Sequence, residues 1–477
     1  MPKIVFVEPQ APNLHIFSHF PLPRLGGLIL GTLMKERGWD VELYVEELRR
    51  IDYDALATAD LVGISTITST APRAYAIADR VREMGVPVIM GGPHVTFLPE
   101  EALAHADYVI RGEGEAALAA FIDAWEGGGG LAEVPNLSYR EDGAAVHNPV
   151  LPPPADLDRN PCPDLSLLKP DPGRTRAFRT IPVQTSRGCP FDCSFCSVTG
   201  MFGKAYRFRS TENIIAELRR YDDPRNSIFF YDDNFCANRA RTKALLEAMI
   251  RERFTFTWTT QVRADVARDL ELVRLMKKAG CHTVYVGFES VNPGSLKDMK
   301  KRQTVEEIDR CVRVLRRHRI KIHGMFVLGF DQDDWASVKR TVRFATRARL
   351  ATTQFLILTP LPGSELYEKL CAERRIAFHD WSLYDAHHVV FKPAGFTLLD
   401  LQKAQMFCHR KFYSLKQMAR KIFAREWLSV AIAHYARKLN RAWKKRNRTF
   451  LRVVELLRPR KGTEISVEYR EKIFLER

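Results

Sequence analysis

Three cysteines stand close together near the middle of the chain. Cys189, Cys193 and Cys196 follow one another with C-x3-C-x2-C spacing. Thiolates at this spacing can converge on one side of a loop, where they suit a soft metal centre, either zinc or an iron–sulfur cluster. A structural zinc site usually takes four protein ligands, but the next cysteines, Cys162 and Cys236, lie outside the loop. Three ligands leave one metal position open, so the spacing predicts a chemical site rather than a structural one.

The same stretch resembles the cluster loop of the radical SAM enzymes. Phe195, the aromatic residue before the last cysteine, matches the pattern of that family. The cysteines follow a β-prone run, residues 181–185, and Gly188 and Pro190 keep the loop irregular. The resemblance implies that Cys189, Cys193 and Cys196 hold a [4Fe-4S] cluster and that S-adenosylmethionine (SAM) chelates the fourth iron. A zinc knuckle and three unrelated buried cysteines are the alternatives.

A repeated strand-and-helix pattern surrounds this loop. Strands are predicted near residues 181–186, 227–232, 254–261, 283–288, 321–328 and 354–359. Helices are predicted between them, near residues 210–221, 238–252, 267–279, 304–318 and 334–348, with Ser210 as an N-cap. Six such units match the partial (β/α)6 barrel of the radical SAM family, and barrel chemistry belongs at the carboxyl ends of the strands.

Polar or glycine-containing runs stand at these strand ends, and the resemblance gives them roles toward SAM. The methionine amine would be bound after the second strand, and a guanidinium at the third could pair with the carboxylate. Polar groups after the fourth strand would face SAM, and the fifth and sixth strand ends would lie beside the adenosine. In that order, the predicted contacts are Asp232 and Asp233, Gln261 and Arg263, Glu289 and Ser290, Gly329, and Leu361. Each could be an ordinary loop residue, but five matches in barrel order support one another.

The first 126 residues also alternate between strand and helix patterns. This alternation predicts an α/β domain with a doubly wound, Rossmann-like parallel sheet, whose ligands bind beyond the carboxyl ends of the strands. Small, polar or flexible groups stand there: Ser65, Thr66, Thr68, Gly91, Gly92, Gly112 and Glu113. The region resembles the cobalamin-binding domain of many radical SAM enzymes, although the Asp-x-His-x-x-Gly motif of many corrinoid proteins is absent. Cobalamin is therefore implied by resemblance, and a domain that lost its cofactor is the alternative. His94 either faces the corrin or caps a loop.

A linker separates the two predicted domains. Residues 141–143 give a hairpin signal, and three prolines at 152–154 stiffen the chain. We therefore expect a cobalamin-binding-type domain at 1–126, a linker at 127–177, a radical SAM barrel at 178–375 and a basic helical region at 376–477. No cysteine precedes Cys162, which argues against the methylthiotransferase branch with its second cluster.

Composition and charge are consistent with a protein of the cytoplasm. The chain has 477 residues and only nine cysteines, which excludes a secreted disulfide framework. Neither a signal peptide nor an apolar run of membrane-spanning length is expected. The net charge is +16, and residues 401–477 carry 21 Lys and Arg against 6 Asp and Glu, or +15. The basicity therefore belongs to the tail.

The tail is predicted to form two helices, at residues 401–424 and 426–443. The second places Leu428, Ile432, Tyr435, Leu439 and Trp443 on one face, with basic residues mostly elsewhere. The apolar face can pack on the barrel, or the basic helix can lie on an anionic membrane surface. RNA binding is the third and least favoured alternative.

Together these features resemble the cobalamin-binding radical SAM enzymes, the group of the class B methylases and the anaerobic Mg-protoporphyrin cyclases. The resemblance implies cleavage of SAM to a 5′-deoxyadenosyl radical, with an electron donor such as ferredoxin or flavodoxin. It favours cobalamin-dependent C-methylation of an unactivated carbon in a lipid or secondary metabolite. Two alternatives stay open: radical oxidative cyclisation or rearrangement without methyl transfer, and a non-catalytic cluster- or corrinoid-binding regulator. Related enzymes act on apolar substrates, so contact with the inner membrane face through the basic C-terminal helices is a further possibility.

Overall fold

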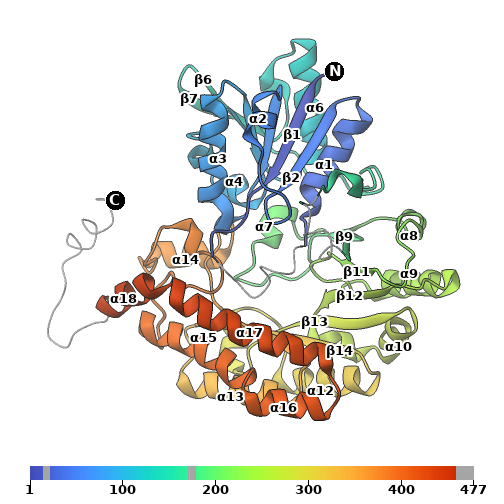
Figure 1. Ribbon diagram of the computed structural model, residues 1–477, viewed down its shortest axis with the longest axis vertical. Helices are drawn as coiled ribbons and strands as arrows, with labels where there is room; N and C mark the ends of the chain where they lie inside the picture. The colour runs from blue at the N-terminus through green and yellow to red at the C-terminus, as the bar shows by residue number, and fades with distance from the viewer. Residues whose placement is uncertain (14–21, 170, 172–178, 458–477) are drawn as a thin grey trace.

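The computed structural model of the protein describes residues 1–13, 22–169, 171 and 179–457. Two β-sheets dominate it, one in each half of the chain (Figure 1). The N-terminal sheet lies at the top of this view, and the second sheet lies below it with the C-terminal helices alongside. The mixed α/β fold agrees with the class predicted from the sequence.

The N-terminal sheet has seven strands in the order β2-β1-β3-β4-β5-β6-β7. The first five strands are parallel, and the last two are antiparallel. The strands are β1 Lys3–Glu8, β2 Asp40–Val45, β3 Leu61–Ser65, β4 Val88–Gly91, β5 Tyr108–Ile110, β6 Leu137–Glu141 and β7 Ala144–His147. The helices are α1 Leu25–Glu36, α2 Tyr53–Ala57, α3 Ala71–Glu83, α4 Pro93–Phe97, α5 Pro99–Ala102 and α6 Gly114–Gly127.

Both faces of this sheet are buried, which explains its nearly continuous apolar strands. Because side chains alternate along a strand, Ile4 and Phe6 of β1 pack on one face with α1 and α6. Val5 and Val7 pack on the other face with α3. The doubly wound arrangement predicted for this region is therefore present.

The hairpin predicted around residues 141–143 forms, but it is not part of a linker. Its strand β6 pairs with β5 and extends the N-terminal sheet. Pairing satisfies the backbone groups that the edge of β5 would otherwise expose. The first structural unit therefore runs at least to His147 rather than ending at residue 126.

The second sheet has six parallel strands in sequence order, β8-β11-β12-β13-β14-β15. This is the open, partial barrel that the repeated units predicted. The strands are β8 Thr180–Val183, β11 Ser227–Phe230, β12 Thr257–Val262, β13 Cys281–Glu289, β14 Lys321–Leu328 and β15 Thr352–Ile357. The helices are α8 Thr211–Arg219, α9 Arg239–Glu252, α10 Leu270–Lys278, α11 Pro293–Asp298, α12 Val305–Arg317, α13 Trp335–Arg347 and α14 Glu365–Ala372. Ser210 caps α8 as predicted, since its hydroxyl accepts a hydrogen bond from the Asn213 amide at 3.1 Å.

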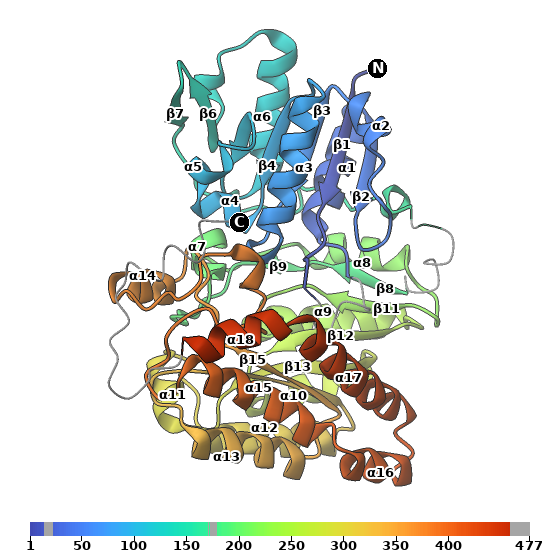
Figure 2. The same ribbon diagram turned by 60° about the vertical axis from the view of Figure 1, so that its left-hand side comes forward.

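The C-terminal region consists of α15 Leu398–Phe412, α16 Leu415–Phe423, α17 Trp427–Arg446 and α18 Arg448–Leu456. The helix predicted over residues 401–424 is thus two helices. Helix α15 packs on β15, where His409 Nε2 lies 3.1 Å from the Phe355 carbonyl oxygen. Helix α17 runs along the same side of the barrel and buries Leu439 and Trp443 of its predicted apolar face (Figure 2). Within the described residues, no helix is long and apolar enough to cross a membrane.

Candidate active site between two facing strand edges

The three cysteines lie on the loop that leaves the first barrel strand, as the sequence indicated. The chain passes from β8 through the short strand β9 Ser186–Arg187 and the cysteine loop, and then enters α7 Val198–Phe202. Gly188 has a φ of +85°, and a Cβ atom there would meet the Ala205 carbonyl oxygen at 2.3 Å. Only glycine allows the chain to turn into the loop at this point.

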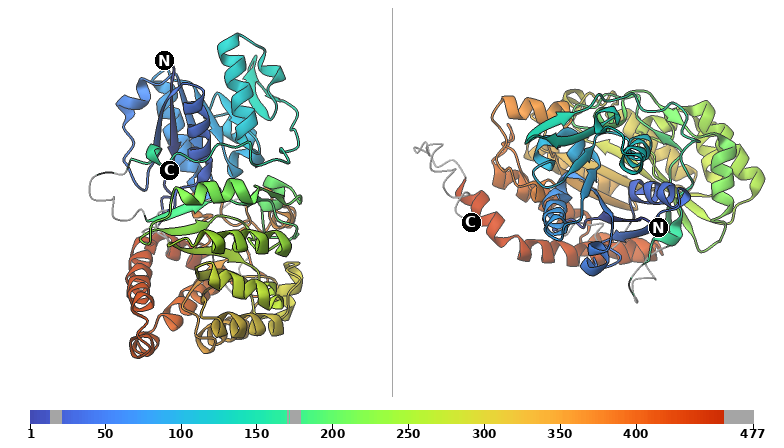
Figure 3. Two further views of the ribbon diagram at one scale, coloured as in Figure 1. Left: turned by 90° about the vertical axis from the view of Figure 1, so that its right-hand side faces the viewer. Right: turned by 90° about the horizontal axis from the view of Figure 1, so that it is seen from above.

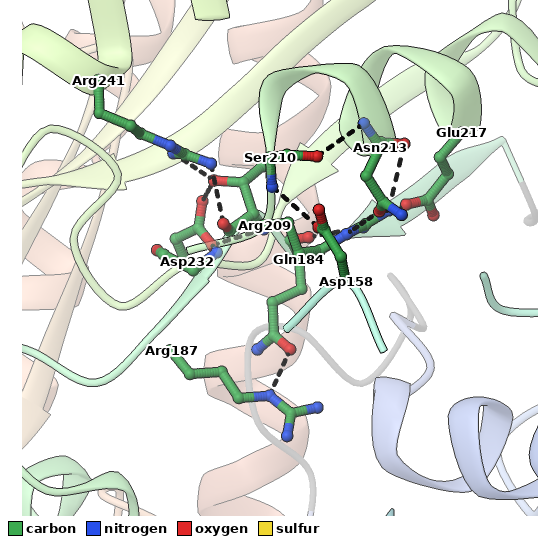
Figure 4. A network of polar contacts seen from close by, with 11 residues as sticks. Asp158, Gln184, Arg187, Arg209, Ser210, Asn213, Glu217, Asp232 and Arg241 are labelled. Carbon is green, nitrogen blue, oxygen red and sulfur yellow. Dashed lines mark hydrogen bonds and ion pairs between the residues drawn. The ribbon is translucent and has the colours of Figure 1, made fainter. Parts of the chain in front are cut away.

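Asp232 fixes the start of this loop (Figure 4). Its carboxylate accepts hydrogen bonds from the Thr185 amide at 2.8 Å, the Thr185 hydroxyl at 2.6 Å and the Ser186 amide at 2.7 Å. Arg241 completes the arrangement by donating to the Thr185 hydroxyl and carbonyl, each at 2.8 Å. Asp232 is fully buried, and burial raises its pKa above the usual range. Its side chain is therefore occupied in holding the loop.

Three further contacts hold the middle of the cysteine loop. The Ser194 amide donates to the Met299 carbonyl at 3.3 Å, and the Ser194 carbonyl accepts from the Leu366 amide at 2.8 Å. The Phe195 ring packs edge-on against Phe330, with centroids 5.9 Å apart. Since Phe330 follows Gly329, the structure brings the predicted Phe195 and Gly329 regions together.

Arg263 points at the cysteine loop. Its Nη1 lies 3.8 Å from Cys193 Sγ, and its guanidinium carbon lies 3.8 Å from the centre of the Phe191 ring. Nη2 donates to the Lys301 carbonyl. The side chain is buried, so its positive charge lies beside a sulfur ligand of the predicted cluster.

Burial affects two of the three thiols of the loop. Burial raises the pKa of Cys189, and it raises the pKa of Cys196 to about 12. All three thiols are free of disulfide bonds and partly exposed, and metal binding would deprotonate them. Among the described residues, no three His, Cys, Asp or Glu side chains are arranged around a single ion.

At the end of β13, the fourth barrel strand, the backbone is strained and the polar side chains have hydrogen-bond partners. Glu289 has a φ of 59°, which is unusual for a residue with a side chain. Its carboxylate accepts a hydrogen bond from Lys301 Nζ at 2.7 Å, with both side chains at most 10% exposed. Ser290 is buried next to it and accepts a hydrogen bond from the Asn292 amide at 3.0 Å. Strain of this kind persists only where the surroundings impose it, and it concentrates at functional sites.

Three other predicted SAM contacts lie at the same edge of the sheet. Burial and the neighbouring Asp232 raise the pKa of Asp233 to about 7. Gln261 is the last residue but one of β12 and is half-buried, and its carbonyl accepts a hydrogen bond from the Phe235 amide. Leu361 is also half-buried, and its carbonyl accepts from the Ser364 hydroxyl at 2.7 Å.

The N-terminal sheet also presents small residues at its carboxyl edge. Ser65, Gly91 and Gly112 are partly exposed there, whereas Thr66 and Thr68 are buried. The Thr66 hydroxyl donates to the Gly91 carbonyl at 3.0 Å. Gly92 has a φ of +101°, and a Cβ atom there would lie 2.4 Å from the Thr66 carbonyl oxygen.

His94, which was predicted either to face the corrin or to cap a loop, contacts a carboxylate of the N-terminal region. It is fully buried, and its Nε2 lies 3.3 Å from Glu101. Glu101 also accepts hydrogen bonds from Tyr75 at 2.9 Å and from Trp381 Nε1 at 2.9 Å. This group links the N-terminal sheet to the segment that follows the barrel.

The carboxyl edges of the two sheets face each other, with α7 and β9 between them (Figures 2 and 3). Glu113, just beyond β5, accepts hydrogen bonds from Arg187 at 2.7 Å and from Arg207. Glu115 accepts a second bond from Arg187. Burial alone would raise the pKa of Glu115, but the Arg187 guanidinium outweighs it and lowers the pKa. A second contact between the two halves of the chain is made by Tyr231, which follows β11 and packs against the core of the N-terminal sheet.

Two protein families match the two halves of this arrangement. Residues 183–345 match the radical SAM superfamily, and residues 18–122 match the B12 binding domain. An uncharacterized methyltransferase of Pyrococcus horikoshii is 34% identical, over 82% of this chain and 88% of its own. The chain belongs to the cobalamin-binding radical SAM family.

Other known proteins extend this match. A bacteriochlorophyllide d C-12(1)-methyltransferase of Chlorobaculum tepidum is 30% identical to this radical SAM enzyme, over 82% of this chain and 83% of its own. The fold matches the solved structure of OxsB, a cobalamin-dependent S-adenosylmethionine radical enzyme, with a TM-score of 0.71. That match covers 99% of this chain and 83% of OxsB at 18% identity. The methyltransferase interpretation is thus supported over cyclisation and over a non-catalytic regulator.

The cofactors of the family are a [4Fe-4S] cluster, SAM and cobalamin. The residues of this enzyme fit them. Three thiols share one loop whose start and middle are held by hydrogen bonds within the protein. Small residues stand at the carboxyl edge of the N-terminal sheet, and the ion pairs of Glu113 with Arg187 and Arg207 join that edge to the strands beside the loop.

Sequence reasoning missed the residues that hold this site together. Thr185, Arg187, Arg207, Arg241 and Lys301 were not predicted, although Arg187 stands two positions before Cys189. Their partners lie 12 to 94 residues away along the chain. A pattern in a single sequence carries no signal for such pairs. The one signal in the sequence is the position of Arg187, two residues before the first cysteine of the motif.

Proposed function

We propose that this enzyme methylates an unactivated carbon of a large apolar substrate, a lipid or a secondary metabolite, between the two facing strand edges. The facing of these edges supports the proposal, since it places the cysteine loop opposite the edge predicted to bind cobalamin. The Chlorobaculum relative is named for methylation of bacteriochlorophyllide d, which is consistent with a bulky substrate of this class.

Cys189, Cys193 and Cys196 would hold the cluster in this proposal. Arg263, already 3.8 Å from Cys193 Sγ, would offset part of the negative charge of the thiolates. When bound, the reduced cluster and SAM supply a 5′-deoxyadenosyl radical, and cobalamin supplies the methyl group. The chain itself contributes orientation and the exclusion of water from the space between the edges.

The predicted SAM contacts divide into two groups. Asp233, Gln261, Ser290, Gly329 and Leu361 stand at the strand ends and are proposed to contact SAM directly. The side chains of Asp232, Arg263 and Glu289 already have partners within the protein. We assign those three to the frame that positions the cluster and SAM.

The predicted cobalamin contacts divide in the same way. We propose that Ser65, Thr68, Gly91, Gly92 and Gly112 line the corrin side of the site. Thr66 and Glu113 have their side chains engaged in the protein. They hold the shape of the edge and its connection to the barrel.

The proposed partners include a reduced ferredoxin or flavodoxin, which would supply the electron for SAM cleavage. They also include a membrane surface, contacted peripherally through the C-terminal helices. The protein is proposed to work in the cytoplasm at the inner face of that membrane.

The test is anaerobic purification followed by measurement of iron, cobalt and corrin absorbance in one sample. With SAM and a strong reductant, the enzyme should release 5′-deoxyadenosine. Replacing Cys189, Cys193 and Cys196 with alanine should abolish both iron binding and SAM cleavage, whereas Cys371→Ala, at an exposed position outside the loop, should retain both. Retained cleavage in the triple variant would contradict the site. With substrate, a product heavier by one methylene unit supports methylation, and turnover without that gain contradicts it.

A further inference from the structure

An exposed apolar corner lies where α16 meets α17, at the end of the molecule far from the N-terminal sheet (Figures 1 and 2). Its five side chains are Leu415, Ile422, Phe423, Trp427 and Leu428, with exposed fractions of 61, 42, 88, 64 and 59%. Among the described residues, twelve large hydrophobic side chains are at least 36% exposed, and this corner holds five of them within fourteen positions. Helix α16 buries none of its residues.

The rest of α17 does not share this exposure. Its predicted apolar face packs on the barrel, where Leu439 and Trp443 are buried and Ile432 and Tyr435 join the barrel core. Within the described part of the tail, the exposed apolar side chains therefore gather at the α16–α17 corner, with Leu456 of α18 exposed apart from them. A contiguous apolar group of this kind marks an interaction site.

A cationic cavity opens directly beside the corner. It has a volume of about 650 Å³, and Phe423 forms part of its wall. Six basic side chains line it: Arg316, Arg319, Lys321, Arg349, Arg420 and Lys421. Glu426 is the single acidic residue in its lining, and it lies 3.7 Å from Lys421 Nζ.

The positive charge of this cavity is largely uncompensated. Lys421 also donates to the Ala351 carbonyl at 2.5 Å, so it is part of the wall. Within the described residues, no salt bridge joins the other five cations to a carboxylate. Such a cavity attracts an anion, and the apolar corner beside it attracts hydrocarbon.

We infer that the α16–α17 corner and the cavity together bind an anionic phospholipid bilayer. The phosphate of a lipid headgroup would occupy the cavity, and Phe423, Trp427 and Leu428 would enter the acyl region. Charge complementarity favours this occupant, since the cytoplasmic leaflet is negative and attracts clustered Lys and Arg. The inference gives a location to the proposed peripheral membrane contact and does not depend on methyl transfer.

The corner anchors the enzyme rather than delivering substrate. Lys321 begins β14, so the cavity lies at the amino ends of the barrel strands. The cysteine loop lies at their carboxyl ends, one strand length away, roughly 25 Å for eight residues. Changes at the corner should therefore alter membrane binding and leave SAM cleavage unchanged.

The experiment is co-sedimentation of the full-length enzyme with phosphatidylcholine vesicles, with and without phosphatidylglycerol. An apolar variant carries Phe423→Ser and Trp427→Ser, and a charge variant carries Arg319→Gln and Arg349→Gln. The matched controls lie on α10, which also exposes both kinds of side chain: Leu270→Ser, and Arg274→Gln with Lys278→Gln. Circular dichroism and SAM cleavage confirm that each variant is folded.

The wild type and both controls should bind anionic vesicles much more tightly than neutral ones. The apolar variant should lose at least tenfold in affinity. The charge variant should lose about fivefold per arginine on anionic vesicles and nothing on neutral ones. Equal binding by the wild type and both variants would show that the corner is not the membrane-binding site and that the protein contacts the membrane elsewhere. No vesicle binding by the wild type would overturn the membrane contact as well, and methyl transfer would be judged by its own assay.

Two other occupants would also overturn the inference. If the variants lose RNA binding in a gel-shift assay while wild type ignores vesicles, the surface recognises nucleic acid. If the apolar variant converts a dimer into a monomer in sedimentation, the corner binds a second copy of the chain.

Discussion

Glu113 connects the two strand edges, so its removal tests whether the ion pairs hold them together. We consider Glu113→Gln, which keeps the shape of the side chain and removes its charge. The Glu113 carboxylate accepts from Arg187 at 2.7 Å and from Arg207, and all three side chains are only 7% exposed. Removing one partner of a buried ion pair costs about 3–5 kcal/mol, because the remaining charge stays buried without compensation.

The lower end of this range applies here. Arg187 keeps its second carboxylate, Glu115, so Arg207 alone loses its acidic partner. We expect the variant to lose about 3 kcal/mol of the free energy of unfolding at pH 7. The control is Glu252→Gln, which breaks the surface pair with Arg219, whose side chain is 60% exposed. Such a pair contributes at most about 1 kcal/mol.

The assay is urea denaturation of both variants together with hydrogen exchange. Stability should fall more in Glu113→Gln than in Glu252→Gln. Exchange should accelerate at the backbone amides around Glu113 and Arg187 and stay unchanged in α12. If Glu113→Gln loses no more stability than the control, or if exchange is unaffected at the interface, the ion pairs do not hold the two edges together.

Three further predictions concern single positions. Burial lowers the pKa of His409 from 6.5 to about 4, so its stabilising contribution is complete above pH 6.5 and disappears as the pH falls through 4. In His409→Gln, the free energy of unfolding should therefore fall less between pH 6.5 and pH 4 than in the wild type, by up to about 3 kcal/mol. Urea titrations at several pH values measure this difference. The same decrease in both proteins would contradict the prediction. Gly92→Ala should force its Cβ against the Thr66 carbonyl and lower both the melting temperature and the retained corrin absorbance; a wild-type melting temperature would show that the contact relaxes freely. Lys301→Met should leave Glu289 buried and unpaired at a cost of about 3–5 kcal/mol, measured by denaturation, and Lys301→Arg should restore most of that loss if charge is the cause.

Most of the fold could be predicted from the sequence, because local periodicity determines it. Each barrel strand alternates with a helix of its own, and Ser210 begins α8 where its residue type predicts a cap. The place of the hairpin in the N-terminal sheet could not be predicted, because a hairpin signal shows only that two strands pair with each other. It does not show which third strand they join, and here that strand is β5.

The candidate site was predictable where a motif is contiguous and unpredictable where partners are distant. The cysteine spacing stands in one loop, so its residues could be named from the sequence. Asp232 could be placed at a strand end, but its engagement with Thr185 depends on how two neighbouring strands are aligned. For the tail, helical periodicity marked α17 as amphipathic, and only the packing of the barrel decides that α16 is the helix left exposed.

The anchoring of the cysteine loop has a consequence for how the enzyme is assembled in the cell. Asp232, Arg241 and the contacts at Ser194 hold the start and the middle of the loop through bonds within the polypeptide. Folding of the loop therefore does not wait for iron, in contrast to small zinc domains that are unfolded without their metal. We expect cells starved of iron to accumulate a stable apoprotein, which iron–sulfur delivery can convert to active enzyme without new protein synthesis.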